Sequence, residues 1–234
     1  LEIKQHRMER DFRLKVRVGQ PRVSYRETIR NPITVTGECI KHAGQAGLFA
    51  KLTVVFEPYR GEESIVVESR LPPDTLPPLF VAAAEQGVRG ALDSGELGFP
   101  VMNVKAAILG GEMDEQLSND TAFTAAGADA VHKAMRDNIV LLEPWMRLEV
   151  TVPDEFLGPV TSDLNARRAE INKLENRDGI CTVETIVPLS KMFDYADKVR
   201  SLSQGRASSS MEPYRYRPAP EEVLRALLHP DENY

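Results

Sequence analysis

The chain has 234 residues, 42% of them hydrophobic and 27% charged, a length that allows two ordinary domains with a core each. Its 29 Lys and Arg residues stand against 35 Asp and Glu residues, and the net charge of −6 argues against a protein that coats nucleic acid through bulk charge. Any contact with RNA must therefore come from local basic patches.

Cysteine, histidine and hydropathy patterns exclude several other classes. Cys39 and Cys181 lie far apart in alternating apolar runs, which predicts buried free thiols in a reducing compartment and no disulfide. No Cys or His pair has the spacing of zinc ligands, so we expect no metal site. The apolar runs are short and the first residues have no signal-peptide pattern, which predicts a soluble, cytoplasmic protein without membrane contact.

The first half of the chain predicts an α+β domain. Leu1 opens the chain without an initiator Met, and residues 4–12 predict a short helix with an unpartnered apolar stripe, as if the sequence had been cut from a longer one. Residues 14–67 alternate as strands do, with a hairpin loop at 44–47. A helix is predicted over residues 76–92, which must lay its apolar face on this sheet.

A strand at residues 101–109, a loop at Gly110 and Gly111, and an Ala-rich helix at about 119–136 complete this first domain near residue 139. A linker is expected near residues 136–144, across which the two domains can change their angle.

The second half predicts the order βαββαβ. Strands are expected at residues 147–152, 170–175, 181–187 and 207–216, with helices at about 154–168 and 189–199 and a turn at 176–179. This order is typical of the ferredoxin-like plan, an antiparallel four-stranded sheet with two helices on one face. An apolar terminal helix is expected at residues 221–228, and it needs a surface to dock on.

Several segments resemble elongation factor G. Residues 18–29 (VGQPRVSYRETI) resemble the entry to domain IV of that family. Residues 163–168 (DLNARR), 188–195 (PLSKMFDY) and 203–206 (SQGR) resemble segments of its domain V. Residues 98–101 (GFPV) and 142–146 (LEPWM) match in register between them, so the resemblance covers essentially the whole chain.

This resemblance implies a two-domain α+β fragment. Residues 1–13 would end domain III, residues 14–139 would form an elongated domain IV like domain 2 of ribosomal protein S5, and residues 140–217 would form a ferredoxin-like domain V. The helix within residues 218–234 would pack back on domain IV.

The resemblance also implies a function. The chain would be the ribosome-binding arm of a factor that promotes GTP-dependent translocation of tRNA and mRNA. Its partners would be rRNA at the decoding centre and the stalk base, together with tRNA and mRNA, and it would act as a monomer. GTP and Mg²⁺ would bind elsewhere in the parent protein, with no cofactor in this chain.

Two loops at the working end of domain IV are the expected contacts with the decoding centre. In the first loop Ala46 stands where the family usually has Arg, and in the second Asp114 stands where the family usually has His. The expected contact residues are Lys41, His42, Gly44, Gln45, Ala46, Gly47, Glu112, Met113, Asp114 and Glu115. Three carboxylates at a surface that approaches phosphates would be repelled. This departure fits either lineage drift in a true translocase or a specialised paralogue.

The resembling part of domain V supplies the expected rRNA contacts, Arg167, Arg168, Lys191, Gln204 and Arg206. Some basic groups there should instead pair with neighbouring acids such as Asp194 and Asp197.

The fragment itself shows no catalytic constellation. It lacks the G-x-x-x-x-G-K-[ST] phosphate loop, and residues 172–175 (NKLE) only superficially resemble a guanine-reading motif. No carboxylate pairs with a His in a spacing that suggests acid–base catalysis, so we expect no enzyme in this chain. Two alternatives remain, a paralogue acting in ribosome recycling or rescue, and a free-standing RNA-binding module.

Overall fold

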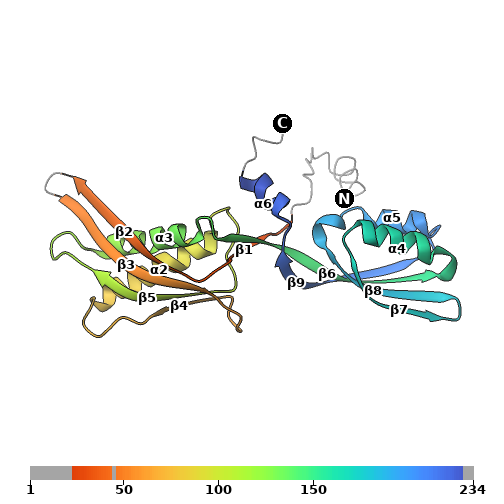
Figure 1. Ribbon diagram of the computed structural model, residues 1–234, viewed down its shortest axis with the longest axis horizontal. Coiled ribbons are helices and arrows are strands. Elements are labelled where there is room, and N and C mark those ends of the chain that lie inside the picture. The colour runs from red at the N-terminus through yellow and green to blue at the C-terminus, as the bar shows by residue number, and fades with distance from the viewer. Residues whose placement is uncertain (1–22, 44–45, 229–234) are drawn as a thin grey trace, which may run out of the picture. The chain divides into compact units, whose positions relative to one another are not determined.

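A computed structural model describes residues 23–43 and 46–228 (Figure 1). They form two compact units, which are treated separately below. The first contains Ser24–Met146 together with the chain from Glu212 onward, and the second contains Arg147–Met211. The helix predicted at residues 4–12 and the strand residues before 23 lie outside the described residues.

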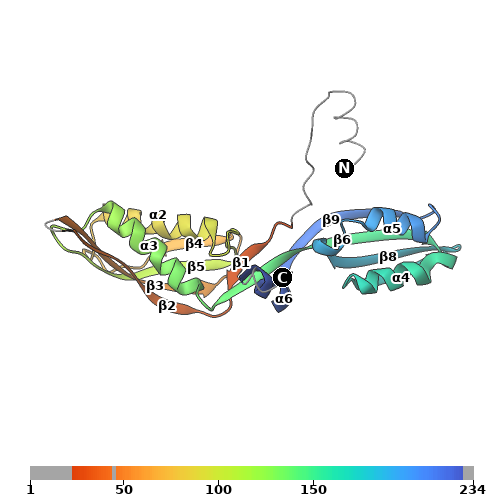
Figure 2. The ribbon, with the colours of Figure 1, turned by 90° about the horizontal axis from the view of Figure 1, so that it is seen from above.

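The first unit is built on a four-stranded sheet with the order β2-β3-β5-β4. Strands β2, β3 and β5 are antiparallel neighbours, and β4 runs parallel to β5. Helices α2 and α3 lie side by side on one face of this sheet (Figures 1 and 2). The elements are β1 (Arg26–Ile29), β2 (Ile33–Ala43), β3 (Ala46–Pro58), β4 (Ile65–Ser69), α2 (Pro78–Ser94), β5 (Val104–Glu112), α3 (Asp120–Met135) and α6 (Glu221–Leu228).

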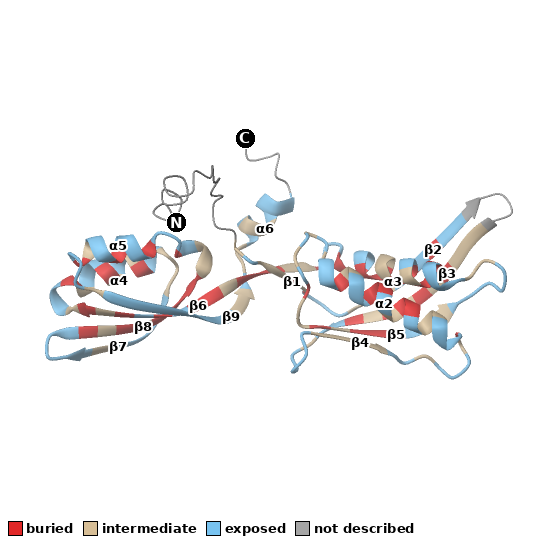
Figure 3. Ribbon diagram, turned by 180° about the vertical axis from the view of Figure 1, so that it is seen from behind, coloured by how far each residue is buried: buried red, intermediate tan, exposed pale blue. Residues whose placement is uncertain are grey.

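The core of this unit lies between the two helices and the sheet, as the buried stripes in Figure 3 show. Phe80 of α2 stacks on Phe123 of α3 with ring centroids 4.8 Å apart. Gly87 lets the two helices approach closely because it has no Cβ atom. A Cβ atom at this position would lie only 2.1 Å from the carbonyl oxygen of Thr124. The helix predicted at residues 76–92 is therefore present, and its apolar face packs as expected.

The prediction of a loop at Gly110 and Gly111 is wrong. Both residues belong to β5 and pair with Thr53 and Leu52, beside a bulge in the β3–β5 ladder. A Cβ atom on Gly111 would lie 2.5 Å from Cδ1 of Leu76, so this glycine is explained by close packing and not by a turn.

The second unit has the ferredoxin-like order that the sequence predicted. β9 pairs with β6 at one side, and the order then continues β6-β8-β7. Along the chain, α4 follows β6 and α5 follows β8. The elements are β6 (Ile139–Pro153), a 3₁₀ turn (Asp154–Phe156), α4 (Leu157–Ala166), β7 (Glu170–Arg177), β8 (Ile180–Pro188), a second 3₁₀ turn (Leu189–Lys191), α5 (Tyr195–Leu202) and β9 (Ser208–Pro218). The start of β6, through Met146, and the end of β9, from Glu212, belong to the first unit.

Two boundaries differ from expectation. The predicted linker near residues 136–144 is mostly strand, because β6 already begins at Ile139 and pairs with β1 through Leu142. The helix predicted from residue 189 starts as a 3₁₀ turn, and the α-helix begins only at Tyr195. The buried free thiols predicted for Cys39 and Cys181 are confirmed.

The terminal helix α6 follows a backbone contact in which the Ala219 N–H donates to the Leu141 carbonyl oxygen at 2.8 Å. Val223 and Leu224 are half-buried, whereas Leu227 and Leu228 are 39% and 47% exposed. Packing of this helix on domain IV therefore stays a prediction.

A buried carboxylate organises the loop that follows α2. Glu27 of β1 is fully buried, and its carboxylate accepts backbone N–H bonds from Glu96 at 2.9 Å, Leu97 at 2.9 Å and Phe99 at 3.0 Å. Burial raises the pKa of Glu27, and the three N–H donors oppose that rise. The glutamate within the YRETI segment thus has a structural role that sequence reasoning did not assign.

Candidate nucleic-acid interface

The two loops predicted to contact RNA follow strands that end at the same side of the first unit's sheet. The β2–β3 ladder continues to the pair Ala43 and Ala46, and β5 ends at Glu112 opposite Lys51 of β3. We call the residues 41–48 and 112–118 the tip. Lys41 is exposed and pairs with Leu48 in the ladder.

Some predicted tip residues are described only in part. Gly44 and Gln45 lie outside the described residues, and for His42 and Ala46 only the strand positions are described. Gly47 pairs with His42 in the ladder. The contacts predicted for these five residues therefore stay predictions.

Asp114 shapes the second tip loop. Its Oδ1 atom accepts the backbone N–H groups of Gln116 at 2.8 Å and Leu117 at 2.9 Å. Its own N–H donates to Oγ of Ser118 at 2.9 Å. This arrangement is an Asx turn, in which a short carboxylate side chain replaces a backbone acceptor. Asp114 therefore stabilises the conformation of the loop, and two backbone N–H groups solvate its negative charge.

Hydrogen bonds fix the second tip segment to Phe49, the residue that follows the first tip segment. The Phe49 N–H donates to the Leu117 carbonyl oxygen at 3.1 Å, and the Ser118 hydroxyl donates to the Phe49 carbonyl oxygen at 2.6 Å. The loop that Asp114 shapes is thus fixed against the start of β3. The strands that lead into the two predicted loops thus end on one side of the sheet.

The tip is less acidic than its composition suggests. Lys51 Nζ lies 4.0 Å from a carboxylate oxygen of Glu112 and 3.8 Å from one of Glu38 on the opposite strand. Glu115 is exposed, and Met113 beside it is 40% exposed. Among the described residues, Asp114 and Glu115 are consequently the exposed tip carboxylates with no cation within 4 Å, and Asp114 is engaged by two backbone N–H groups.

Arg167, predicted to contact rRNA, is engaged within the second unit. Its guanidinium donates to Asp163 at 2.7 Å, to the two carboxylate oxygens of Asp194 at 2.7 and 3.3 Å, and to the Lys191 carbonyl oxygen at 2.5 Å. The guanidinium lies over the ring of Tyr195 at 5.2 Å. The bond to Asp194 raises the pKa of Arg167 and lowers the pKa of the Asp194 carboxyl. Only 12% of the Arg167 side chain is exposed, so it clamps α4 to the segment before α5.

The remaining predicted contacts of this unit are more accessible. Arg206 is half exposed, lies 2.7 Å from Glu155 and sits over the ring of Phe156 at 4.5 Å. Gln204 is exposed in a left-handed conformation at the end of α5, where φ is 52°. Lys191 is exposed. Arg168 is partly buried and has an interaction partner in the structure. The expected pairing of basic groups with Asp194 and Asp197 is confirmed by the ion pairs of Arg167 and Arg200.

Sequence reasoning missed a basic groove at the other end of β3. Two adjoining cavities of about 770 Å³ and about 490 Å³ share Arg60, Asn103, Tyr216 and Pro218. The signal in the sequence was the run Tyr214-Arg215-Tyr216-Arg217, in which aromatic and basic residues alternate. It was interpreted only as a strand, because its partners come from distant segments.

The described residues contain no group of three or more His, Cys, Asp or Glu side chains placed to hold a metal ion. Within the same residues, no helix has the length and apolar character to cross a membrane.

Comparison with known proteins gives two family matches that follow one another along the chain. Residues 21–138 match the profile described as elongation factor G, domain IV, and residues 140–227 match that of the elongation factor G C-terminus.

Individual proteins agree with these matches. The chain is 41% identical over 230 residues to the elongation factor G of Fervidobacterium nodosum and 40% identical over 232 residues to that of Thermotoga maritima. Both alignments cover 97% of this chain, but only 33% and 34% of those proteins, so the chain spans about one third of their length. A crystal structure of a Thermus thermophilus protein matches with a TM-score of 0.85 and 31% identity, covering 100% of this chain and 35% of that one.

Proposed function

The chain belongs to the elongation factor G family, and from this premise we propose that it is the ribosome-binding arm of a translation elongation factor. The matched segments are domain IV and the C-terminal domain and do not include the GTPase domain. GTP and Mg²⁺ act in the part of such a protein that lies outside this chain. The arm itself binds and positions, and performs no bond-breaking step.

The observation that carries this proposal is the joining of two loops into one tip within the segment that matches domain IV. Leu117 and Ser118 bond to Phe49, which follows the first loop along the chain, and Asp114 fixes the shape of the second loop. A surface that must press against RNA needs a rigid scaffold, because a mobile loop loses ordering entropy on contact. Exposed Lys41 provides a cation at this surface for phosphate contact.

In the proposed mechanism, the C-terminal unit docks on rRNA near the stalk base of the large subunit. The tip enters the decoding centre and holds the paired tRNA and mRNA forward of the A site while the ribosome relaxes. GTP hydrolysis elsewhere in the protein controls entry and release. The factor acts as a monomer in the cytoplasm.

A toeprint assay tests the proposal. Because the chain spans about one third of its relatives, the protein for the assay is a chimaera in which it replaces the matching third of Thermotoga maritima elongation factor G. With GTP and a stalled pre-translocation ribosome, we expect the mRNA to advance by one codon. Unmodified Thermotoga maritima factor is the positive control.

Tip variants make this assay specific. The double variant K41A/Q45A should slow codon advance, whereas R89A, which removes an exposed charge from α2, should leave the rate unchanged. Equal rates for the tip variant and the parent chimaera would refute the tip contacts.

The acidic tip residues Glu112, Asp114 and Glu115 keep one alternative in view, a paralogue for ribosome recycling or rescue. That alternative predicts ribosome binding without codon advance, together with subunit splitting in the presence of recycling factor.

A further inference from the structure

The groove at the base of the first unit is rich in arginine. Its charged lining residues are one glutamate, Glu62, and four arginines, namely Arg30, Arg60, Arg215 and Arg217. The arginines come from the ends of β1 and β9 and from the loop after β3, and a chain with a net charge of −6 concentrates them around two adjoining cavities. We call the lining of these two cavities the basal groove.

Carboxylates pair with six arginines elsewhere in the described chain. Ion pairs within 4 Å join Arg70 to Glu68, Arg167 to Asp194, Arg177 to Glu175, Arg200 to Asp197, Arg206 to Glu155 and Arg225 to Glu221. Among the described residues, Arg30, Arg60 and Arg215 have no carboxylate within this distance. Their donors therefore remain available to an external anion.

Aromatic rings lie against the arginines of the groove. The guanidinium of Arg217 lies 4.2 Å from the ring centroid of Trp145, and that of Arg215 lies 4.9 Å from the centroid of Tyr214. Arg26 lies over Tyr216 at 5.6 Å, and the Tyr216 hydroxyl donates to the Ser24 carbonyl oxygen at 3.0 Å. Such stacking orders a guanidinium while leaving its charge intact.

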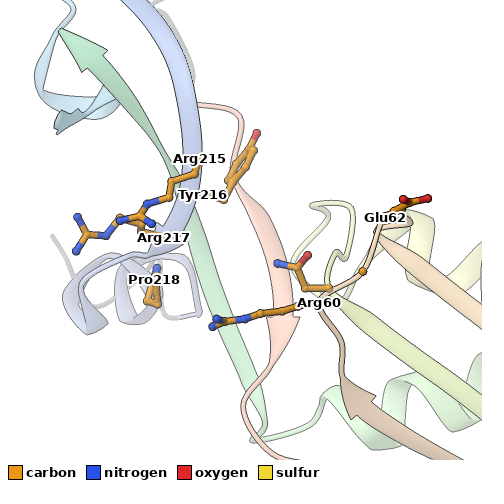
Figure 4. A pocket seen from close by; sticks show the side chains of 8 residues that line it. Arg60, Glu62, Arg215, Tyr216, Arg217 and Pro218 are labelled. Atoms are coloured by element: carbon orange, nitrogen blue, oxygen red, sulfur yellow. The ribbon is translucent and has the colours of Figure 1, made fainter.

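The close view in Figure 4 shows how these side chains are placed. Arg215 and Arg217 leave β9 on one side of the strand and Tyr216 on the other, as strand alternation requires. Arg60 extends from its loop towards Pro218, and Glu62 points away from Arg60. The single carboxylate of the lining therefore does not cancel the charge of Arg60.

We propose that the basal groove binds the phosphate backbone of ribosomal RNA, as a contact separate from the tip. Guanidinium groups bind phosphate oxygens through two parallel N–H bonds, and tyrosine faces accept stacked bases or riboses. The inference rests on the proposed function in one respect, which is that ribosomal RNA supplies the phosphates. Because the groove lies at the opposite end of β3 from the tip, the first unit would be held at both ends of that strand.

The test compares two charge-matched double variants of the 234-residue chain. R60Q/R215Q removes two groove charges, and R89Q/R225Q removes two exposed charges from helices of the same unit. Binding to 70S ribosomes is measured by co-sedimentation at increasing KCl concentration. Urea midpoints are compared first, and they should agree because all four side chains are exposed.

We expect R60Q/R215Q to bind roughly tenfold or more weakly at low salt. The plot of log affinity against log salt should also become shallower, by about one for each phosphate that the variant no longer binds. The control variant should change affinity less than about twofold, since long-range effects of exposed charges are screened.

Other outcomes overturn the inference in distinguishable ways. Equal affinity and salt slope for R60Q/R215Q and the wild-type chain, with K41A binding more weakly, would reject the groove and leave the proposed function standing. A wild-type chain that does not bind ribosomes would reject both. Binding of R60Q/R215Q to a polyglutamate peptide is measured as well. If this variant loses peptide binding but keeps its ribosome binding, the groove binds an acidic protein and the RNA proposal is rejected.

Discussion

Replacing Glu27 by Gln (E27Q) changes one buried atom from acceptor to donor at nearly constant volume. The amide oxygen can take the place of Oε1 and accept from Leu97 and Phe99, but the amide nitrogen would then face the Glu96 N–H, which donates to Oε2 at 2.9 Å. A buried N–H left without an acceptor costs about 1–3 kcal/mol, and each bond that loses its charged acceptor weakens by about 1 kcal/mol. Relief of the buried charge offsets part of this cost.

We therefore expect E27Q to lower the free energy of unfolding at pH 7 by about 2–4 kcal/mol. Urea denaturation, followed through the midpoint at constant m value, measures the change. The control is E63Q, at an exposed glutamate of the same unit, which should cost less than about 0.5 kcal/mol. A loss below about 0.5 kcal/mol in E27Q would refute the assigned role of the carboxylate.

The pH dependence gives an independent check. Because burial raises the pKa of Glu27 in the folded state, ionisation of this group costs stability as pH rises from its unfolded pKa through its folded pKa. The wild-type chain should therefore gain stability relative to E27Q when the pH falls from 7 towards about 4.3, the ordinary pKa of Glu. A difference that shrinks in acid would mean that the three N–H bonds outweigh burial.

Further changes separate packing, clamp and loop contributions. G87A should cost about 2–4 kcal/mol because its Cβ meets the backbone of α3, whereas G90A, with nothing within 4 Å, should stabilise by about 0.5–1 kcal/mol; thermal denaturation compares them. R167M should lower the free energy of unfolding of the second unit by about 1–3 kcal/mol, measured by urea denaturation, because it leaves partly buried acceptors unpaired. D114A should cost about 1 kcal/mol and speed hydrogen exchange at the two amides that the side chain caps, while D114N should not. Burial and the neighbouring Asp154 raise the pKa of Cys181, so this thiol should react with Ellman's reagent at about pH 7.5 only after unfolding in urea.

Periodic patterns predicted much of the fold. Helical spacing of apolar residues located α2, and alternation of strands and helices predicted the ferredoxin-like order of the second unit. The errors occurred where one residue type has two physical uses. Gly110 and Gly111 were interpreted as a turn although Gly111 makes room for Leu76, and the segment around Pro144 was interpreted as a linker although it belongs to β6.

The candidate site was harder to predict. Positions 41–48 and 112–115 could be chosen from their resemblance to known loops, but the capping role of Asp114 depends on the path of the backbone after it. The basal groove combines segments near residues 30, 60, 103 and 216, which no local pattern connects. A sequence indicates which side chains are basic, and only the fold indicates which of them meet.

The first unit is discontinuous in the chain, and this has a consequence for its synthesis. Residues from Glu212 onward complete a body that begins at Ser24, while Arg147–Met211 lies between the two parts in the sequence. A chain emerging from its N-terminus can therefore close the inserted unit before the enclosing one. The enclosing unit must wait for the last strand to deliver Tyr216 to Ser24 and Ala219 to Leu141. Nascent chains stalled before residue 212 should thus expose a nearly finished but unclosed body to chaperones and proteases.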